Sequence, residues 1–176
     1  MDVVEIDGEI TEIAKKYFYL DRLIEEYDLS NNKRLNLITE DGRTYLNNNT
    51  KKYDAILNDA FSGTTPAKTL TTIEHIKNIK KSLNIGGVYL TNIISSLDGD
   101  NSKFLKAEVN TLKKVFKNVY TVPCNYSDDI YKTQNIMVIA TDEDLNYEKA
   151  YNINIDENEI IITDDYCPVD SLIPKD

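Results

Sequence analysis

The sequence predicts an α/β protein built on a doubly wound, mostly parallel sheet. Three observations indicate this class. Short apolar runs of strand length alternate along the chain with amphipathic segments of helix length. The run at 53–59 is nearly apolar through Ala55, Ile56 and Leu57, as is typical of a parallel strand covered on both faces. Acidic side chains follow three successive predicted strands, at the edge where open α/β sheets bind their ligands.

The first half of the chain contains three of the expected strands. The first lies at 2–6, and beyond Gly8 apolar side chains recur at the spacing of one buried helix face. The second lies at 34–38 and ends in a polar, turn-forming run. The third, at 53–59, precedes a helix whose apolar positions extend over 70–83.

The second half adds three further strands. A strand at 88–94 is followed by an amphipathic helix at 104–116. Strands at 119–123 and 134–140 complete the set, separated by a polar stretch.

Composition narrows the class of partner. With 176 residues the chain is long enough for one domain. We expect that domain at 1–145, with residues 146–176 as an acidic extension packed on it. A formal charge of −10 argues against nucleic acid or an anionic membrane as partner.

Cysteine and histidine usage excludes several kinds of site. Cys124 and Cys167 have neither a disulfide framework nor metal-ligand spacing, so reduced thiols in a cytoplasmic protein are expected. The acidic start is unlike a secretory signal. His75, the only histidine, is expected off the apolar stripe of its helix, which argues against a histidine triad and a zinc site. No metal is expected.

The acids after the strands have two interpretations. Each can cap a following helix, or each can contact a ligand. We favour capping for Asp7 and ligand contact for Glu5, Asp41 and Asp59. An acidic edge suits a cationic or hydroxyl-rich ligand, such as a nucleoside with a sulfonium centre, and does not suit a polyphosphate.

Four segments in order carry a resemblance to a known family. The chain resembles the spermidine synthase (polyamine aminopropyltransferase) family, a branch of the class I fold that binds S-adenosylmethionine. The segments are VVEIDGEITEIAKKYF, ITEDGRTYL, YDAILNDAFSGTTPAKTLTTIEHI and LNIGGVYLTNI. The resemblance implies a Rossmann-like sheet whose last strand is antiparallel to its neighbours.

The resemblance also implies a cosubstrate and roles for individual residues. The cosubstrate would be decarboxylated S-adenosylmethionine, or S-adenosylmethionine itself, and the acceptor an amine. Glu5 would hold the ribose hydroxyls, Asp41 would accept a hydrogen bond from the adenine amino group, and Asp59 would face the reacting centre. Ser62 stands where the family has a second aspartate, and Tyr126 is a candidate for the tyrosine of the substrate loop.

The family's glycine-rich first unit has no counterpart in the sequence, so a chain truncated at its N-terminus is expected. In the family's sheet order the absent strand lies between those of Val4 and Ile56, which leaves two unpaired edges. We expect either direct pairing of these two strands or a homodimer through this edge, and favour the dimer.

Three functions remain open from the sequence. The first is an aminopropyltransferase, which motif order favours. The second is a methyltransferase-like enzyme that uses Asp59 on another acceptor. The third is a non-catalytic remnant or interaction subunit, which the absent glycine loop favours.

Overall fold

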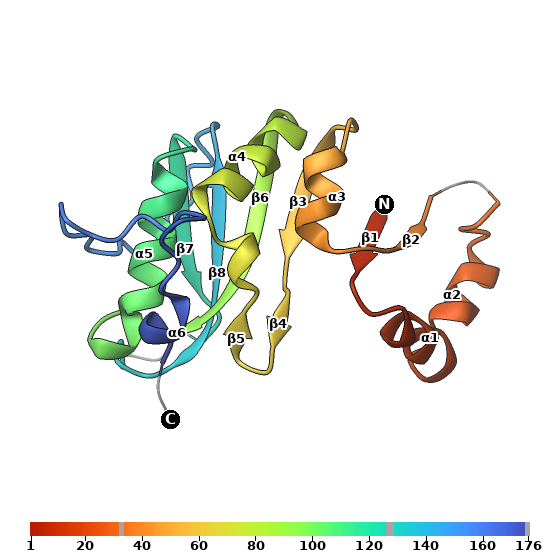
Figure 1. The fold of residues 1–176 in the computed structure, drawn as a ribbon, viewed down its shortest axis with the longest axis horizontal. Helices are drawn as coiled ribbons and strands as arrows, with labels where there is room; N and C mark the ends of the chain where they lie inside the picture. The colour runs from red at the N-terminus through yellow and green to blue at the C-terminus, as the bar shows by residue number, and fades with distance from the viewer. Residues whose placement is uncertain (32–33, 126–128, 175–176) are drawn as a thin grey trace. The chain divides into compact units, whose positions relative to one another are not determined.

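The computed structural model describes residues 1–31, 34–125 and 129–174 (Figure 1). The chain divides into two compact units, Met1–Asn49 and Thr50–Asp176. None of the helices within the described residues is long and apolar enough to span a membrane.

The N-terminal unit is a two-stranded parallel sheet with three helices. Its sheet pairs the first two strands in register, with Val4 opposite Ile38. The hydroxyl of Tyr45 donates a hydrogen bond to Asp2 at 2.8 Å, which ties the last helix to the first strand. The elements are β1 (Asp2–Glu5), α1 (Gly8–Tyr17), α2 (Leu20–Glu26), β2 (Asn36–Thr39) and α3 (Gly42–Asn48).

This unit has an open apolar face. Among its described residues none is fully buried. On α1, Ile10 is 50% exposed and Ile13 is 43% exposed, although both belong to the helix's apolar face. The apolar pattern of this segment therefore has no closed core within its own unit.

The C-terminal unit is built on a four-stranded sheet in the order β3-β6-β8-β7. β3 and β6 pair in parallel, and β8 runs antiparallel to both β6 and β7. The predicted antiparallel last strand is therefore confirmed. The strands are β3 (Tyr53–Asn58), β6 (Leu83–Ser95), β7 (Asn118–Pro123) and β8 (Gln134–Thr141).

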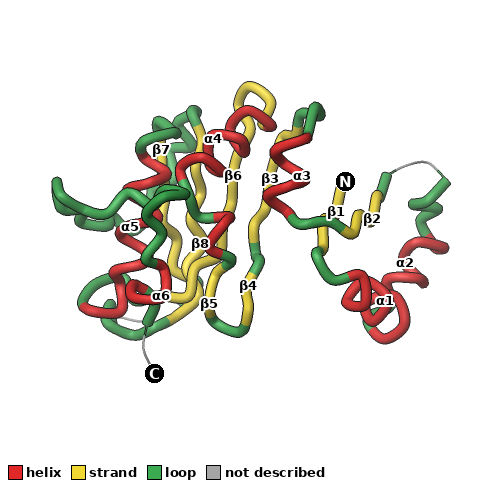
Figure 2. Tube along the Cα trace, viewed as in Figure 1, coloured by secondary structure: helices red, strands yellow, loops and turns green. Residues whose placement is uncertain are grey.

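Two longer helices cover one face of this sheet (Figure 1). α4 (Ile73–Ser82) links β3 to β6, and α5 (Lys103–Lys113) links β6 to β7. A small hairpin precedes α4, and one-turn helices lie before α4, before α5 and near the C-terminus (Figure 2). These are β4 (Phe61–Ser62), β5 (Thr65–Pro66), η1 (Lys68–Leu70), η2 (Asp100–Ser102) and α6 (Val169–Leu172).

The core lies between the sheet and these helices. Alternate side chains of β6 point into it, and the other face of β6 is only partly buried. The polypeptide after β8 also contributes, because Ile162 is 0% exposed and its backbone N–H donates to the Thr111 hydroxyl at 3.0 Å. The fully buried apolar side chains of the core include Tyr89, Ile76, Ile79, Ile93, Leu105, Leu112, Ile136 and Ile162.

One expectation from the sequence is wrong. His75, expected off the apolar stripe of its helix, is 2% exposed, because α4 contacts α5 as well as the sheet and therefore buries a wider arc. Within the described residues of each unit, β1 pairs with β2, and β3 pairs with β6.

Candidate functional site

At the end of β1, a local hydrogen-bonded turn links the acidic residues Glu5 and Asp7. The backbone N–H of Asp7 donates to the Glu5 carboxylate at 2.9 Å. The Asp7 carboxylate in turn accepts from the backbone N–H of Glu9 at 2.9 Å and caps α1. The expected capping role of Asp7 is thus present, and Glu5 remains at the carboxyl end of β1.

Asp41 lies on the adjoining strand end. The backbone N–H of Glu40 donates a hydrogen bond to the Glu5 carbonyl at 3.1 Å. The backbone immediately before Asp41 therefore lies beside Glu5. The Asp41 carboxylate accepts from the backbone N–H of Thr44 at 2.8 Å and caps α3. Sequence reasoning favoured ligand contact here, and the structure adds a capping role that one oxygen, Oδ1, fulfils.

Asp59 belongs to a layer of polar side chains at the carboxyl end of the C-terminal sheet. Asn92 of β6 donates to the Asp59 carboxylate at 3.0 Å and to the Asn135 side chain of β8 at 3.1 Å. Asn58 donates to the Tyr89 hydroxyl at 3.1 Å. Asp59 itself is exposed. The arrangement holds one carboxylate in a defined orientation at the solvent edge of the sheet.

Ser62, three residues after Asp59, lies in the β4–β5 hairpin opposite Thr65 and is exposed. The turn of this hairpin uses Gly63 at φ +64, a conformation that favours glycine. Tyr126 lies outside the described residues. The binding and catalytic roles of these residues stay predictions.

Sequence reasoning missed Glu108. This residue of α5 is 2% exposed, and burial raises the pKa of its carboxyl to about 8. It helps to line a cavity of about 10 Å³, together with Asn58 and Asn92. A usable pattern existed: Glu108 lies three residues after Leu105 and four before Leu112, so an acid interrupts the apolar stripe of an amphipathic helix.

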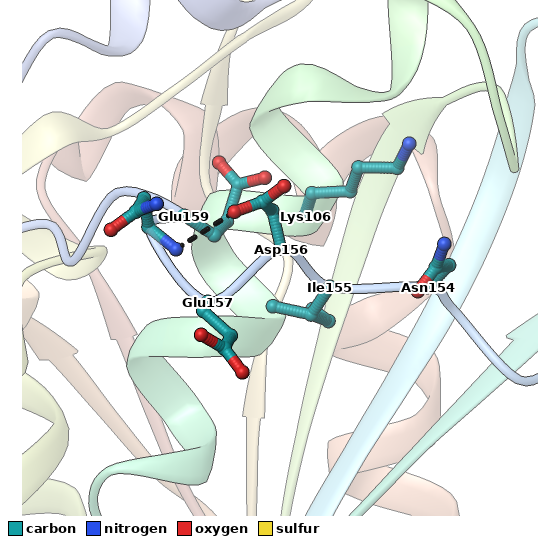
Figure 3. Close-up of a pocket in the computed structure, with 7 residues that line it drawn as sticks. Lys106, Asn154, Ile155, Asp156, Glu157 and Glu159 are labelled. Carbon is teal, nitrogen blue, oxygen red and sulfur yellow. Dashed lines mark hydrogen bonds between the residues drawn. The ribbon is translucent and has the colours of Figure 1, made fainter.

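A larger hollow lies elsewhere in the same unit (Figure 3). It measures about 510 Å³ and is lined by Lys106 and the loop of residues 154–159. The Lys106 ammonium points away from Asp156 and forms an ion pair with Asp98 at 2.8 Å. The lining includes none of the strand-end acids, so this hollow does not match the predicted site.

The sheet topology and the acids at the strand ends define the class of fold to which the protein belongs. A sheet with parallel β3 and β6, antiparallel β8, and acids at strand ends is that of the class I methyltransferase type. The chain is similar to a probable spermidine synthase from Corynebacterium glutamicum, with a TM-score of 0.66 and 23% identity over 81% of this chain and 47% of that one. It is also similar to human methyltransferase-like protein 13, whose structure holds SAH, with a TM-score of 0.61 and 18% identity over 86% and 63% of the two chains.

The family model for the spermine/spermidine synthase domain matches residues 1–149, and the chain belongs to this family. The chain is similar to a polyamine aminopropyltransferase of Thermoplasma volcanium, with 33% identity over 119 residues, which are 66% of this chain and 40% of the relative. The chain spans less than half the length of the curated relatives it matches.

Proposed function

We propose that the protein transfers an aminopropyl group from decarboxylated S-adenosylmethionine to an amine acceptor. Membership of the spermine/spermidine synthase family supports this reaction class. The observation that carries the proposal is the position of Asp59. This residue follows β3 at the carboxyl end of the strand, where open α/β sheets bind ligands, and Asn92 orients its carboxylate by a hydrogen bond. We also propose a cytoplasmic location, where the free thiols of Cys124 and Cys167 would stay reduced.

In this proposal Asp59 binds the attacking amine and takes a proton from it as the new carbon–nitrogen bond forms. The carbon–sulfur bond of the donor breaks in the same step, and methylthioadenosine leaves. An amine attacks only when its lone pair is free, so a carboxylate within reach lowers the barrier. Glu5 and Asp41 bind the ribose hydroxyls and the adenine amino group of the nucleoside. Ser62 contributes a hydrogen bond to the acceptor. Tyr126 contributes a further contact to the acceptor.

Replacing Asp59 with asparagine should lower the transfer rate by about 10²–10⁴-fold, because asparagine keeps an oxygen for Asn92 but cannot take a proton. The assay follows release of methylthioadenosine from the donor in the presence of 1,4-diaminobutane. Asp54→Asn, on the same strand, is the matched control, since its oxygen can still accept from Asn84.

The assay also separates the other two functions. If Asp59→Asn transfers the aminopropyl group as fast as the wild type does, the proposed role of Asp59 is contradicted. Release of the demethylated nucleoside from S-adenosylmethionine, with no aminopropyl transfer, would favour the methyltransferase-like enzyme. Absence of turnover with either donor would favour the non-catalytic subunit.

We further propose a homodimer that uses the edge of β3. In the described part of the chain, β3 pairs with β6 alone, and Leu57 on it is 72% exposed. Such an edge readily pairs with a second chain, and a lysine on it discourages pairing. Light scattering at micromolar concentration should show a dimer for the wild type and a monomer for Leu57→Lys. A wild-type monomer would contradict the proposal.

A further inference from the structure

A small cavity lies behind the end of β3, on the side of the sheet that the helices cover. Its volume of about 10 Å³ is the space of one water molecule. Asn58 pairs with Thr91, which is 5% exposed on the buried side of β6, so the Asn58 side chain lies on the same face. Glu108 of α5 belongs to the same lining. The cavity therefore connects the helix layer with the residue that precedes Asp59.

Glu108 brings an unsatisfied carboxyl to this cavity. Its side chain is 2% exposed, and within the described residues its Oε2 atom has no hydrogen-bond partner. Burial raises the pKa of the carboxyl to about 8, so at pH 7 the group is mostly protonated and can donate a hydrogen bond. A buried polar atom without a partner is costly, and an ordered water commonly fills that role.

The lining meets the requirements of one ordered water, which needs about two to four polar partners. The Asn58 side-chain nitrogen donates to the Tyr89 hydroxyl at 3.1 Å, which leaves the amide oxygen as an acceptor. The Thr71 hydroxyl donates to the Lys68 carbonyl at 2.8 Å, which leaves its oxygen as an acceptor as well. Thr71 and Asn58 both line the cavity with Glu108. A water that accepts from Glu108 can donate to both oxygens.

Asn58 links this water site to Asp59. Asn58 is the last residue of β3, and Asp59 follows it outside the strand. The Asp59 carboxylate accepts from Asn92 at 3.0 Å, and Asn92 also lines the cavity. An Asn58 amide that is held at both its nitrogen and its oxygen fixes the backbone from which Asp59 projects. Release of that amide would let the Asp59 carboxylate move away from Asn92.

We propose that one buried water occupies this cavity and that Glu108, acting through this water and Asn58, is a positioning residue for Asp59. The inference rests on the proposed aminopropyl transfer and adds to it a residue that touches neither the donor nor the acceptor. Without the water, Asp59 spends less time where it can take the proton of the attacking amine. The loss falls on turnover, because the nucleoside is bound by other residues.

Two substitutions at position 108 test the positioning role. Glu108→Gln keeps a donor and an acceptor for the water, and its kcat should stay within about threefold of the wild type. Glu108→Met has a similar unbranched shape but cannot hold the water, so it should lower kcat at least about tenfold while KM for the donor changes less than about twofold. Glu157→Met, at an exposed position, is the control and should leave both constants unchanged. Equal kcat values for Glu108→Met and Glu108→Gln would overturn the positioning role.

A substitution at the other end of the link gives an independent measurement. Asn58→Ala removes the amide that the water contacts and should lower kcat as Glu108→Met does. Because both residues act through the same water, the double variant should be no slower than the slower single variant. Losses that multiply in the double variant would contradict a shared link. Circular dichroism verifies that each variant is folded.

A crystal structure of the wild type without substrates tests the water itself. One water should lie within about 2.5–3.2 Å of both Glu108 Oε2 and the Asn58 amide oxygen. In crystals of Glu108→Met or Asn58→Ala, the water should be absent and the Asp59 carboxylate displaced from Asn92. A wild-type cavity without a water, or an undisplaced Asp59 in both variants, would overturn the inference. If the water and the displacement are present but the wild type transfers no aminopropyl group, the proposed reaction fails and the structural link stands.

Discussion

Replacing Glu108 with glutamine is expected to stabilise the protein above pH 7 and to flatten the fall of its stability with pH. Burial raises the pKa of Glu108 to about 8, from an ordinary value of 4.5. Between these values the folded state keeps a proton that the unfolded state has released. The free energy of unfolding therefore decreases as pH rises, by up to about 1.4 kcal/mol per pH unit.

Glu108 changes the free energy of unfolding only within a defined range of pH. Below about pH 4.5 both states hold the proton, so the contribution of Glu108 is constant. Above about pH 8 the folded carboxyl also ionises and the loss is complete. Tyr89, the titratable neighbour of Glu108, stays neutral across this range because burial raises its pKa as well. Glutamine has no proton to lose, so its variant should lack this slope.

Urea unfolding at pH 5, 6, 7 and 8, followed by circular dichroism, measures the slope. The difference between Glu108→Gln and wild type should grow with pH and reach a few kcal/mol at pH 8. Glu157→Gln, an exposed exchange of the same atoms, should follow the wild type. Parallel curves for Glu108→Gln and wild type would show that Glu108 is ionised or well solvated in the folded protein.

Ile76→Ala is expected to cost about 2–5 kcal/mol of stability, whereas Ile13→Ala should cost less than about 1 kcal/mol. The two substitutions are chemically identical, and each lies on a helix of ten residues. Ile76 is 0% exposed between α4 and the sheet, so its removal leaves a cavity. Ile13 is 43% exposed on α1, where solvent already reaches the side chain.

Urea unfolding of both variants at one pH and at micromolar concentration gives the comparison. A loss for Ile13→Ala as large as that for Ile76→Ala would mean that the apolar face of α1 is covered in solution. Repeating the measurement over a range of protein concentrations would then show whether a second chain supplies the cover, since only association makes the loss concentration-dependent.

Much of the candidate site could be predicted because strand ends are a local property of the sequence. Asp7, Asp41 and Asp59 each follow an apolar run, and the structure places each within two residues of the end of a strand. Glu108 could not be assigned in the same way. Its helix was predicted, but whether an acid within an apolar stripe is solvated or buried depends on what packs above it.

The sequence by itself determined the order of strands and helices, the antiparallel last strand implied by the family resemblance, and the acids at the strand ends. Tertiary structure alone decided which apolar faces are covered. It buried His75 and Glu108, because α4 and α5 pack against each other as well as the sheet. It left Ile13 exposed within its unit. Hydrophobic periodicity is a property of neighbouring residues, whereas burial requires a partner surface from a distant part of the chain.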